Sequence, residues 1–536
     1  MKHLLLSGLA SAALLAACSP EDNQNTSNVR VTQTQAETAL SEMGLFGDIN
    51  PNITYATLDV SDNQAVFRDV VFQAEADDEG TLPAPVRVAE MIVTAPRLGA
   101  GDMLELDGLT LNQISMQDED SELSIRRIIV DQPNAMMAND IGFLFSGSSF
   151  EDESVDISAY TFRTLAIEDL ELVANTPATK DAEASDVAIR LDRMGIDHDL
   201  ETGLGELELS DFYLSATEDD TPVSLSVGAA TLSGLATRSL IPLMQGTTAA
   251  ALKGDDERVE SAIENITAEF VGQFQSRPWE VYRSWQLDDI AMNASGIVIA
   301  MDALRSGYEI NGDIVTERME LGALTLGAEG SSQEATELAE ALDGLGYDEM
   351  SLTASYEARI DTVNDRYYSV RPGIIELEDG LRITIDQDFS GYLAYQDANG
   401  ATMAEYGLEQ DEVPLDVTLS DLELLHLNRL DIQLEDNSLL ERAFTLAGAE
   451  QGLTAEEMRA QMSALVMISM MGAGDAIPRE VSSQLTPALM SFITNGGTLR
   501  IASEPDTPYS IGEVVQDGMS NTLDINALGL TITQEQ

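Results

Sequence analysis

Several oxygen-bearing side chains near residue 390 have the spacing of a calcium-binding loop. They match positions 1, 3, 5 and 12 of the twelve-residue template: Asp386, Asp388, Ser390 and Asp397. Gly391 takes the sixth position, where the template needs a sharp turn. That template needs a helix on each side, whereas residues 381–385 and 392–395 are typical of strands. We therefore prefer a plain β-turn here and keep a calcium site as the alternative.

Residues that commonly carry hydrolytic chemistry are scarce. His198 and His426 are the only histidines after His3, and neither has the spacing of a paired-histidine metal site. Each lies in an alternating apolar stretch and is interpreted as structural. The chain has no G-x-S-x-G motif, no S-x-x-K motif, no phosphate-binding loop and no dinucleotide fingerprint. We predict a non-enzymatic protein, with a hydrolase of unknown substrate as an alternative.

The first residues indicate export. Met1-Lys2-His3 gives a positive start, residues 4–15 form an apolar run, and small residues precede Cys18, the only cysteine. This order is typical of a cleaved signal peptide, and the run is too short to span a bilayer. The sequence therefore predicts a signal peptide over residues 1–17.

The four residues Leu15-Ala16-Ala17-Cys18 resemble the lipobox of bacterial lipoproteins. The resemblance implies cleavage before Cys18, covalent lipid on that cysteine, and stable membrane attachment through several acyl chains. Ser19 follows the cysteine, which in that family favours the outer membrane, so the body would face the periplasm. Residues 18–30 are polar after the cysteine and are predicted to form a lipidated tether. An ordinary signal peptide with a chance cysteine is the alternative.

The charge of the chain is strongly one-sided. It has 94 acidic residues against 27 lysines and arginines, which gives a formal net charge of −67. Such a field repels nucleic acid and attracts cations, and so excludes nucleic acid as a partner. The acidic residues are spread along the chain, which indicates solubility rather than an acidic tail. The hydrophobic fraction of 44% is enough to bury a core.

Alternating apolar residues predict strands through much of both halves. In the first half we expect strands at residues 53–59, 65–72, 86–93, 103–116, 160–162, 165–172, 187–191, 204–214 and 223–235. Apolar residues at helical spacing predict helices at 34–44, 256–274, 333–346 and within 438–493.

Two apolar groups are candidates for ligand binding. Trp279 and Trp285 flank Tyr282 and Arg283 and follow Arg277, so they form either a ligand platform or packing at a domain junction. A second group is a methionine-rich segment that includes Met462, Met467 and Met470. Residues 464–471 are apolar nearly all round, so we expect them to be buried in a core. An adaptable groove for lipid or a partner protein is the alternative.

The two halves of the chain share short patterns in the same order. Residues 39–45 resemble 341–347, Tyr55 to Asp59 resembles Tyr356 to Asp361, and residues 106–111 resemble 419–424. A later acidic turn at 120–123 resembles 436–439. Self-similarity at this long period predicts two related modules.

Repeated L-x-L strands behind an export signal resemble the AsmA/TamB class of envelope proteins and uncharacterised exported β-repeat proteins. The C-terminal stretch that begins Gly497-Thr-Leu-Arg-Ile501 is similar to endings in the latter group. AsmA/TamB proteins have grooved β-sheets associated with lipid transport, which implies an apolar ligand. That class usually has a transmembrane anchor, in place of which this chain has the lipobox.

We therefore expect a β-rich α+β fold made of two related modules of curved antiparallel sheet with packed amphipathic helices. The modules would span residues 31–278 and 279–536, with a helical region at 438–493. The expected function is that of an envelope lipoprotein that binds or scaffolds, and that holds lipid or another apolar ligand in a groove. A purely structural protein-interaction module is the alternative.

Overall fold

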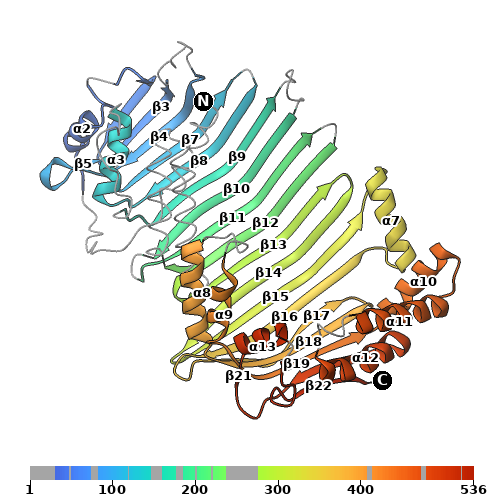
Figure 1. Cartoon of the computed structure of the whole chain (residues 1–536). Coiled ribbons are helices and arrows are strands. Elements are labelled where there is room, and N and C mark those ends of the chain that lie inside the picture. Colours follow the sequence, from blue (N-terminus) through green and yellow to red (C-terminus); the bar gives the residue numbers. More distant parts are fainter. Residues whose placement is uncertain are drawn as a thin grey trace. The chain divides into compact units, whose positions relative to one another are not determined.

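The computed structural model describes residues 30–47, 50–73, 83–118, 120–146, 160–176, 185–199, 202–218, 221–236, 276–406, 413–472, 478–520 and 522–535. These residues fall into two compact units. Unit 1 holds the described residues up to 236 together with Glu280–Tyr282, and unit 2 holds residues 276–279 together with those from Arg283 onward. Figure 1 shows the strands and helices of both units. The lipobox with Cys18, the tether up to residue 29 and the expected helix at 256–274 lie outside the described residues.

Unit 1 is built on an antiparallel sheet whose strands pair mostly in sequence order. Its strands are β1 (Ile53–Thr54), β2 (Thr57–Ser61), β3 (Gln64–Phe72), β4 (Val86–Thr94), β7 (Gly108–Gln117), β8 (Ser121–Asp131), β9 (Thr164–Thr176), β10 (Ser185–Asp199), β11 (Leu204–Glu218) and β12 (Thr221–Ala236). A separate pair, β5 (Arg97–Leu98) and β6 (Leu104–Glu105), lies between β4 and β7 in sequence around the short 3-10 helix η1 (Ala100–Asp102).

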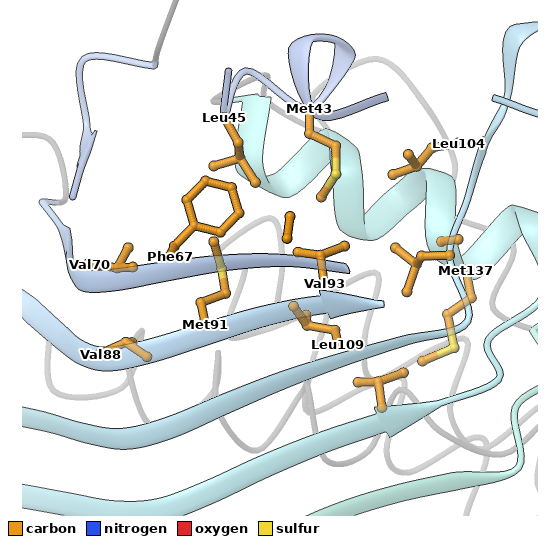
Figure 2. Close-up of a cluster of buried hydrophobic side chains, with 14 of the residues drawn as sticks. Met43, Leu45, Phe67, Val70, Val88, Met91, Val93, Leu104, Leu109 and Met137 are labelled. Carbon is orange, nitrogen blue, oxygen red and sulfur yellow. The ribbon is translucent and has the colours of Figure 1, made fainter. Parts of the chain in front are cut away.

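The core of unit 1 lies between its first strands and two helices, α2 (Gln33–Glu42) and α3 (Ala135–Ser146). Figure 2 shows Met43 and Leu45, which follow α2, above Phe67 and Met91 of the strands, with Met137 of α3 to the right. Phe67 and Met91 are fully buried. Deep burial of such large side chains is the main stabilising contribution that this part of the chain makes, at roughly 2 kcal/mol for each.

In unit 2 the strands are antiparallel, and consecutive strands are neighbours from β13 to β20. Its strands are β13 (Ser284–Ala294), β14 (Ile297–Asn311), β15 (Ile314–Ala328), β16 (Met350–Asp361), β17 (Arg366–Leu377), β18 (Leu381–Ser390), β19 (His426–Asp436), β20 (Gly497–Ser503), β21 (Tyr509–Ser510) and β22 (Leu530–Glu535). Its helices are α6 (Pro278–Val281, shared with unit 1), α7 (Gln333–Leu345), α8 (Tyr392–Tyr406), α9 (Leu415–Leu422), α10 (Leu439–Gln451), α11 (Ala455–Gly472), α12 (Arg479–Asn495) and α13 (Ile511–Met519).

The unit 2 sheet has one apolar face. Side chains alternate across a strand, so residues in register on neighbouring strands share a face. One such row is entirely aliphatic and runs across five strands: Leu321, Ala354, Ile375, Ile383 and Leu434. A second aliphatic row lies beside it: Met301, Leu324, Leu352, Leu377 and Leu381. We call this surface the apolar face of unit 2.

The opposite face of the same sheet carries arginine–carboxylate pairs. Arg305 pairs with Asp288 at 3.0 Å, Arg429 with Asp386 at 2.9 Å, and Arg500 with Asp431 at 2.6 Å. Arg366 pairs with Asp388, and Arg318 and Arg371 both lie within 3.6 Å of Glu357. Neighbouring opposite charges stabilise a sheet through cross-strand contacts. We call this surface the polar face.

The helices that the structure describes cover parts of the apolar face. At the C-terminal strands, α12 packs Ala488 and Phe492 against Leu499 and Ile532. Near the ends of β14 and β15, α7 is anchored by its buried Ala335 and Leu342. At the opposite strand ends, α8 places Leu393 in an aromatic cluster. The middle of β14 to β18 lies between these helices (Figure 1).

The expectation of a β-rich α+β fold with antiparallel sheet and packed helices is confirmed. Helices expected at 34–44, 333–346 and within 438–493 are present as α2, α7 and α10 to α12. Residues 160–162 are not a strand, and residues 392–395 begin helix α8, so both strand predictions are wrong. Residues 103–116, expected as one strand, are divided between two sheets, because β6 ends at Glu105 and β7 begins at Gly108.

The segments matched in sequence have similar structures at their start but not further on. Both α2 and α7 end near the matched residues, and each is followed by antiparallel strands. Residues 108–111, however, lie in strand β7, whereas residues 419–422 lie in helix α9. Leucines spaced three and two residues apart fit either a helix or a strand, so these two similar sequences have different secondary structures.

Candidate apolar binding site

Two adjoining cavities open on the apolar face of unit 2. The larger, of about 420 Å³, has a lining that is aliphatic except for one threonine: Ile299, Leu324, Thr325, Leu326, Met350, Leu352, Ile375, Leu377, Leu381 and Ile383. The smaller, of about 280 Å³, adds polar groups: Met319, Leu321, Ala354, Ser355, Tyr356, Ser369, Gly373, Ile374, Ile375, Ile385 and Gln387. Ile375 lines both cavities. We call the two cavities together the apolar trough.

The trough exists because the sequence places large aliphatic side chains on a face that no helix of the described ranges covers at this point. Ile375 is 37% exposed and Met292, further along the same face, is 38% exposed. Contiguous exposed apolar surface is uncommon on a protein without a ligand or partner for it. The combined volume falls within the range of about 300–1,000 Å³ that is typical of small-molecule sites.

A partly buried carboxyl lies on the apolar face beyond the smaller cavity. Glu317 follows the alternation of Val315, Met319 and Leu321, so its side chain is on the same face. Tyr308 Oη donates a hydrogen bond to Glu317 Oε1 at 3.0 Å, and the hydroxyl of Tyr356 donates another. Removal from water raises the pKa of Glu317, and the two hydrogen bonds oppose this rise.

Aromatic side chains surround this carboxyl. Trp279 packs edge-on against Tyr308 with ring centroids 6.1 Å apart, and Tyr367 stacks on Tyr392 at 4.6 Å. These rings belong to one cluster with Tyr356, Val315, Ala358, Ile360, Phe389 and Leu393. Burial, together with the nearby carboxyl of Glu317, raises the pKa values of Tyr356, Tyr367 and Tyr392, so these hydroxyls keep their protons. The cluster therefore offers hydrogen-bond donors and aromatic faces beside one acidic group.

Only one of the two predicted tryptophans belongs to this cluster. Trp279 is buried at 5% exposure within it. Trp285 lies on β13 opposite Ser306 of β14 and is half-buried. A single platform formed by both tryptophans is therefore not what the structure shows.

The methionine-rich segment forms helix α11, and its burial is a prediction that the structure contradicts. Met458 is buried at 4% exposure, but Met462 and Met467 are exposed, as are Leu465 and Ile468. Met470 is half-buried. The helix contacts α10 and α12, which bury the turn that holds Met458 and leave the apolar residues after it outside the core. None of these methionines lines the apolar trough.

The four residues of the expected calcium loop do not form a loop. Asp386, Asp388 and Ser390 lie on strand β18, whereas Asp397 lies in helix α8. The carboxyl groups of the three aspartates are paired with arginines: Asp386 with Arg429, Asp388 with Arg366, and Asp397 with Arg277 at 2.8 Å. Within the described ranges, no group of three or more histidine, cysteine or acidic side chains has the geometry to hold a metal ion.

Sequence reasoning missed Glu317 and its tyrosines. The available signal was an acidic residue at an apolar position of an alternating strand, in Val315-Thr-Glu317-Arg-Met319. Among 94 acidic residues this signal is weak. The tyrosines reach Glu317 from β14, β16, β17 and the start of α8, so their proximity depends on strand register and not on local sequence.

A family model described as "Uncharacterized protein" matches residues 374–535. This stretch runs from β17 to β22 and contributes part of the lining of both cavities. No curated protein matches the chain. Across the described residues, no helix has both the length and the hydropathy needed to cross a membrane.

Proposed function

We propose that unit 2 binds the apolar chain of an amphiphilic small molecule in the trough. The observation that carries this proposal is the aliphatic lining of the larger cavity, where Thr325 is the one residue that is not aliphatic. An apolar chain that leaves water for this surface gains about 25 cal/mol for each Å² buried. The polar groups at the Glu317 end suit a ligand that is polar at one end only.

The dimensions of the trough fit an extended chain. From Leu326 to Glu317, strand β15 spans about 30 Å at ~3.3 Å per residue. The larger cavity lies at the Leu326 end, the smaller cavity follows, and Glu317 lies beyond it. A linear amphiphile laid along β15 would therefore place its tail on aliphatic residues and its head near the tyrosines.

The setting of this binding function is part of the same proposal. We place the protein at the cell envelope as a non-enzymatic lipoprotein, anchored by lipid on Cys18 and facing the periplasm from the outer membrane. The export signal and the lipobox resemblance support this placement. An exported carrier of apolar molecules needs both an anchor and a surface such as the trough.

The relation between the units also belongs here. We infer that they are related modules with curved sheets. The shared order of helix and strands after α2 and after α7 supports the relation. Register shifts between Gly205 and Glu206, between Leu321 and Leu324 and between Tyr368 and Gly373 support the curvature, because bulges bend a strand.

Native mass spectrometry with lipid extraction tests the binding function, using the chain produced from Ser19 onward. We expect a bound mass that is recovered as an amphiphile. Leu352→Trp fills the larger cavity and should remove that mass. The neighbouring Thr353→Trp lies on the polar face and should leave the mass in place. Loss of ligand in both variants, or a wild-type protein that takes up neither an extracted lipid nor the neutral probe N-phenyl-1-naphthylamine, would contradict the proposal.

A second candidate function has its own observation. The exposed apolar residues Met462, Leu465, Met467 and Ile468 of α11 are available for contact with another protein, which would suit a protein-interaction module.

A further inference from the structure

We propose that Glu317 and the rings around it bind a positively charged ammonium head group of the amphiphile held in the trough. This inference rests on the proposed function and names the class of its ligand. It starts from a desolvated carboxyl of unit 2 that has no counter-ion among the described residues. On the polar face, Asp288, Asp386, Asp388, Asp431 and Glu357 each have an arginine partner. Among the described residues, no lysine, arginine or histidine lies within ion-pair distance of Glu317.

The position of Glu317 makes the lack of a counter-ion costly. It lies on the apolar face between Tyr308 of β14 and Ala358 of β16, its partners in register. A carboxylate that is partly removed from water and has no counter-ion destabilises the fold unless hydrogen bonds or a ligand compensate. The hydroxyls of Tyr308 and Tyr356 supply part of this compensation. A ligand cation would supply the rest.

The surrounding rings fit a ligand with an ammonium group better than a ligand with a further neutral hydrogen-bond donor. Aromatic faces attract cations because the ring quadrupole is negative above and below its plane, and assemblies of such rings bind quaternary ammonium ligands. Trp279, Tyr308, Tyr356, Tyr367 and Tyr392 provide five rings at this end of the sheet. A trimethylammonium group at the Tyr356 end of the smaller cavity would lie beside a ring whose hydroxyl bonds to Glu317, and it needs no hydrogen bond of its own.

The smaller cavity connects this group to the trough. Tyr356 lines that cavity and also donates its hydroxyl to Glu317. Met319, the register partner of Tyr356, lines the cavity as well and is two residues from Glu317 on the same face. A ligand whose tail lies in the trough would therefore have its head group near Tyr356 and Glu317. The net charge of −67 favours the approach of a cation and disfavours an anion.

Three ligands with the same twelve-carbon chain and different heads test the proposal below their micelle concentrations: dodecyltrimethylammonium, dodecyl maltoside and dodecyl phosphate. Binding to the chain from Ser19 onward is measured by calorimetry. We expect the cation to bind about 10-fold more tightly than the maltoside, and the phosphate to bind most weakly. Glu317→Gln keeps the size of the side chain and should remove the preference for the cation while leaving maltoside affinity within about twofold.

Glu320→Gln is the matched control, because Glu320 is exposed on the opposite face of the same strand. It should retain the preference for the cation, which separates the local role of Glu317 from the general charge of the protein. Equal binding of all three heads, or a cation preference that survives Glu317→Gln, would overturn the head-group proposal and leave the binding function intact. If none of the three amphiphiles binds to the protein, the binding function itself is overturned. Thermal unfolding of each variant shows whether the fold is retained.

Discussion

Asp388 and Arg366 are joined across β17 and β18 by two hydrogen bonds, from Nε to Oδ1 at 2.8 Å and from Nη2 to Oδ2. Asn428 Nδ2 donates a third bond to Oδ1 at 3.0 Å. Burial acts to raise the pKa of Asp388, but the bonds from Arg366 and Asn428 outweigh it and hold the pKa below its ordinary value. This pair therefore contributes stability only while Asp388 is ionised.

Arg366→Leu should destabilise the protein by about 1–3 kcal/mol at pH 7, because it leaves a buried carboxylate with one partner fewer. The stability from a depressed carboxyl pKa is lost as pH falls through that pKa. The difference between wild type and variant should therefore shrink below pH 4. Urea unfolding at pH 7 and pH 3.5 measures both values. Arg429→Leu is the comparison, since its partner Asp386 is more exposed, and its cost should be smaller.

Glu317 should show the opposite dependence on pH. Desolvation raises its pKa above the usual 4.5. At pH values between the usual pKa and the raised pKa, the folded state therefore binds more protons than the unfolded state. Stability from this group is then greatest at low pH and falls as pH rises. Glu317→Gln should remove that fall, whereas Glu320→Gln should keep it. Urea midpoints between pH 4.5 and pH 8 test this, and parallel profiles for wild type and Glu317→Gln would contradict it.

His198 gives a third pH effect, in unit 1. Its ring is buried at 7% exposure and stacks on Phe162 with centroids 5.6 Å apart. Burial lowers the pKa of His198 below 6.5, so the folded protein holds the ring neutral. Stability should fall as pH drops from 6.5 through the lowered pKa. His198→Phe keeps the stacking and should flatten this part of the profile. Chemical unfolding of wild type and His198→Phe at pH 7.5 and 5.5 measures this, and equal slopes would contradict it.

Two residues of α11 should respond very differently to truncation. Met458 is 4% exposed and packs with Phe444 and Ile493, so Met458→Ala should cost about 2–4 kcal/mol. Ile468 is 61% exposed, and Ile468→Ala should change the free energy of unfolding by less than about 0.5 kcal/mol. Equal costs would mean that the apolar end of α11 is covered by a partner, such as a second copy of the chain.

These residues show how far sequence could lead. The alternation of apolar residues was enough to predict most strands. Helix α11, within the predicted helical region 438–493, begins with a capping box formed by Thr454 and Glu457. Thr454 N donates to Glu457 Oε2 at 2.8 Å, and Glu457 N donates to Thr454 Oγ1 at 3.2 Å. The exposure of the methionines after Met458 was not predictable, because sequence alone does not show which apolar helix faces pack against another helix.

The site itself depended on information that a sequence does not contain. Strand alternation put Glu317 on the apolar face, but only the register of β14, β15 and β16 brings Tyr308 and Tyr356 to it. The start of α8 was expected to be a strand, so the contact of Tyr392 with Tyr367 was missed. Non-local pairing of this kind is set by the whole sheet and not by any short segment.

The uneven charge of the protein has a consequence for an uncovered aliphatic surface. Arginines on the polar face offset only some of the acidic residues, and the net charge stays at −67. Copies of the chain therefore repel one another over about 10 Å at 0.1 M salt, further than direct aliphatic contact reaches. This repulsion acts as a dispersant: it keeps the trough of one molecule from adhering to another while a small amphiphile without negative charge can still enter. Colloidal stability and ligand access are thus obtained from the same excess of carboxylates.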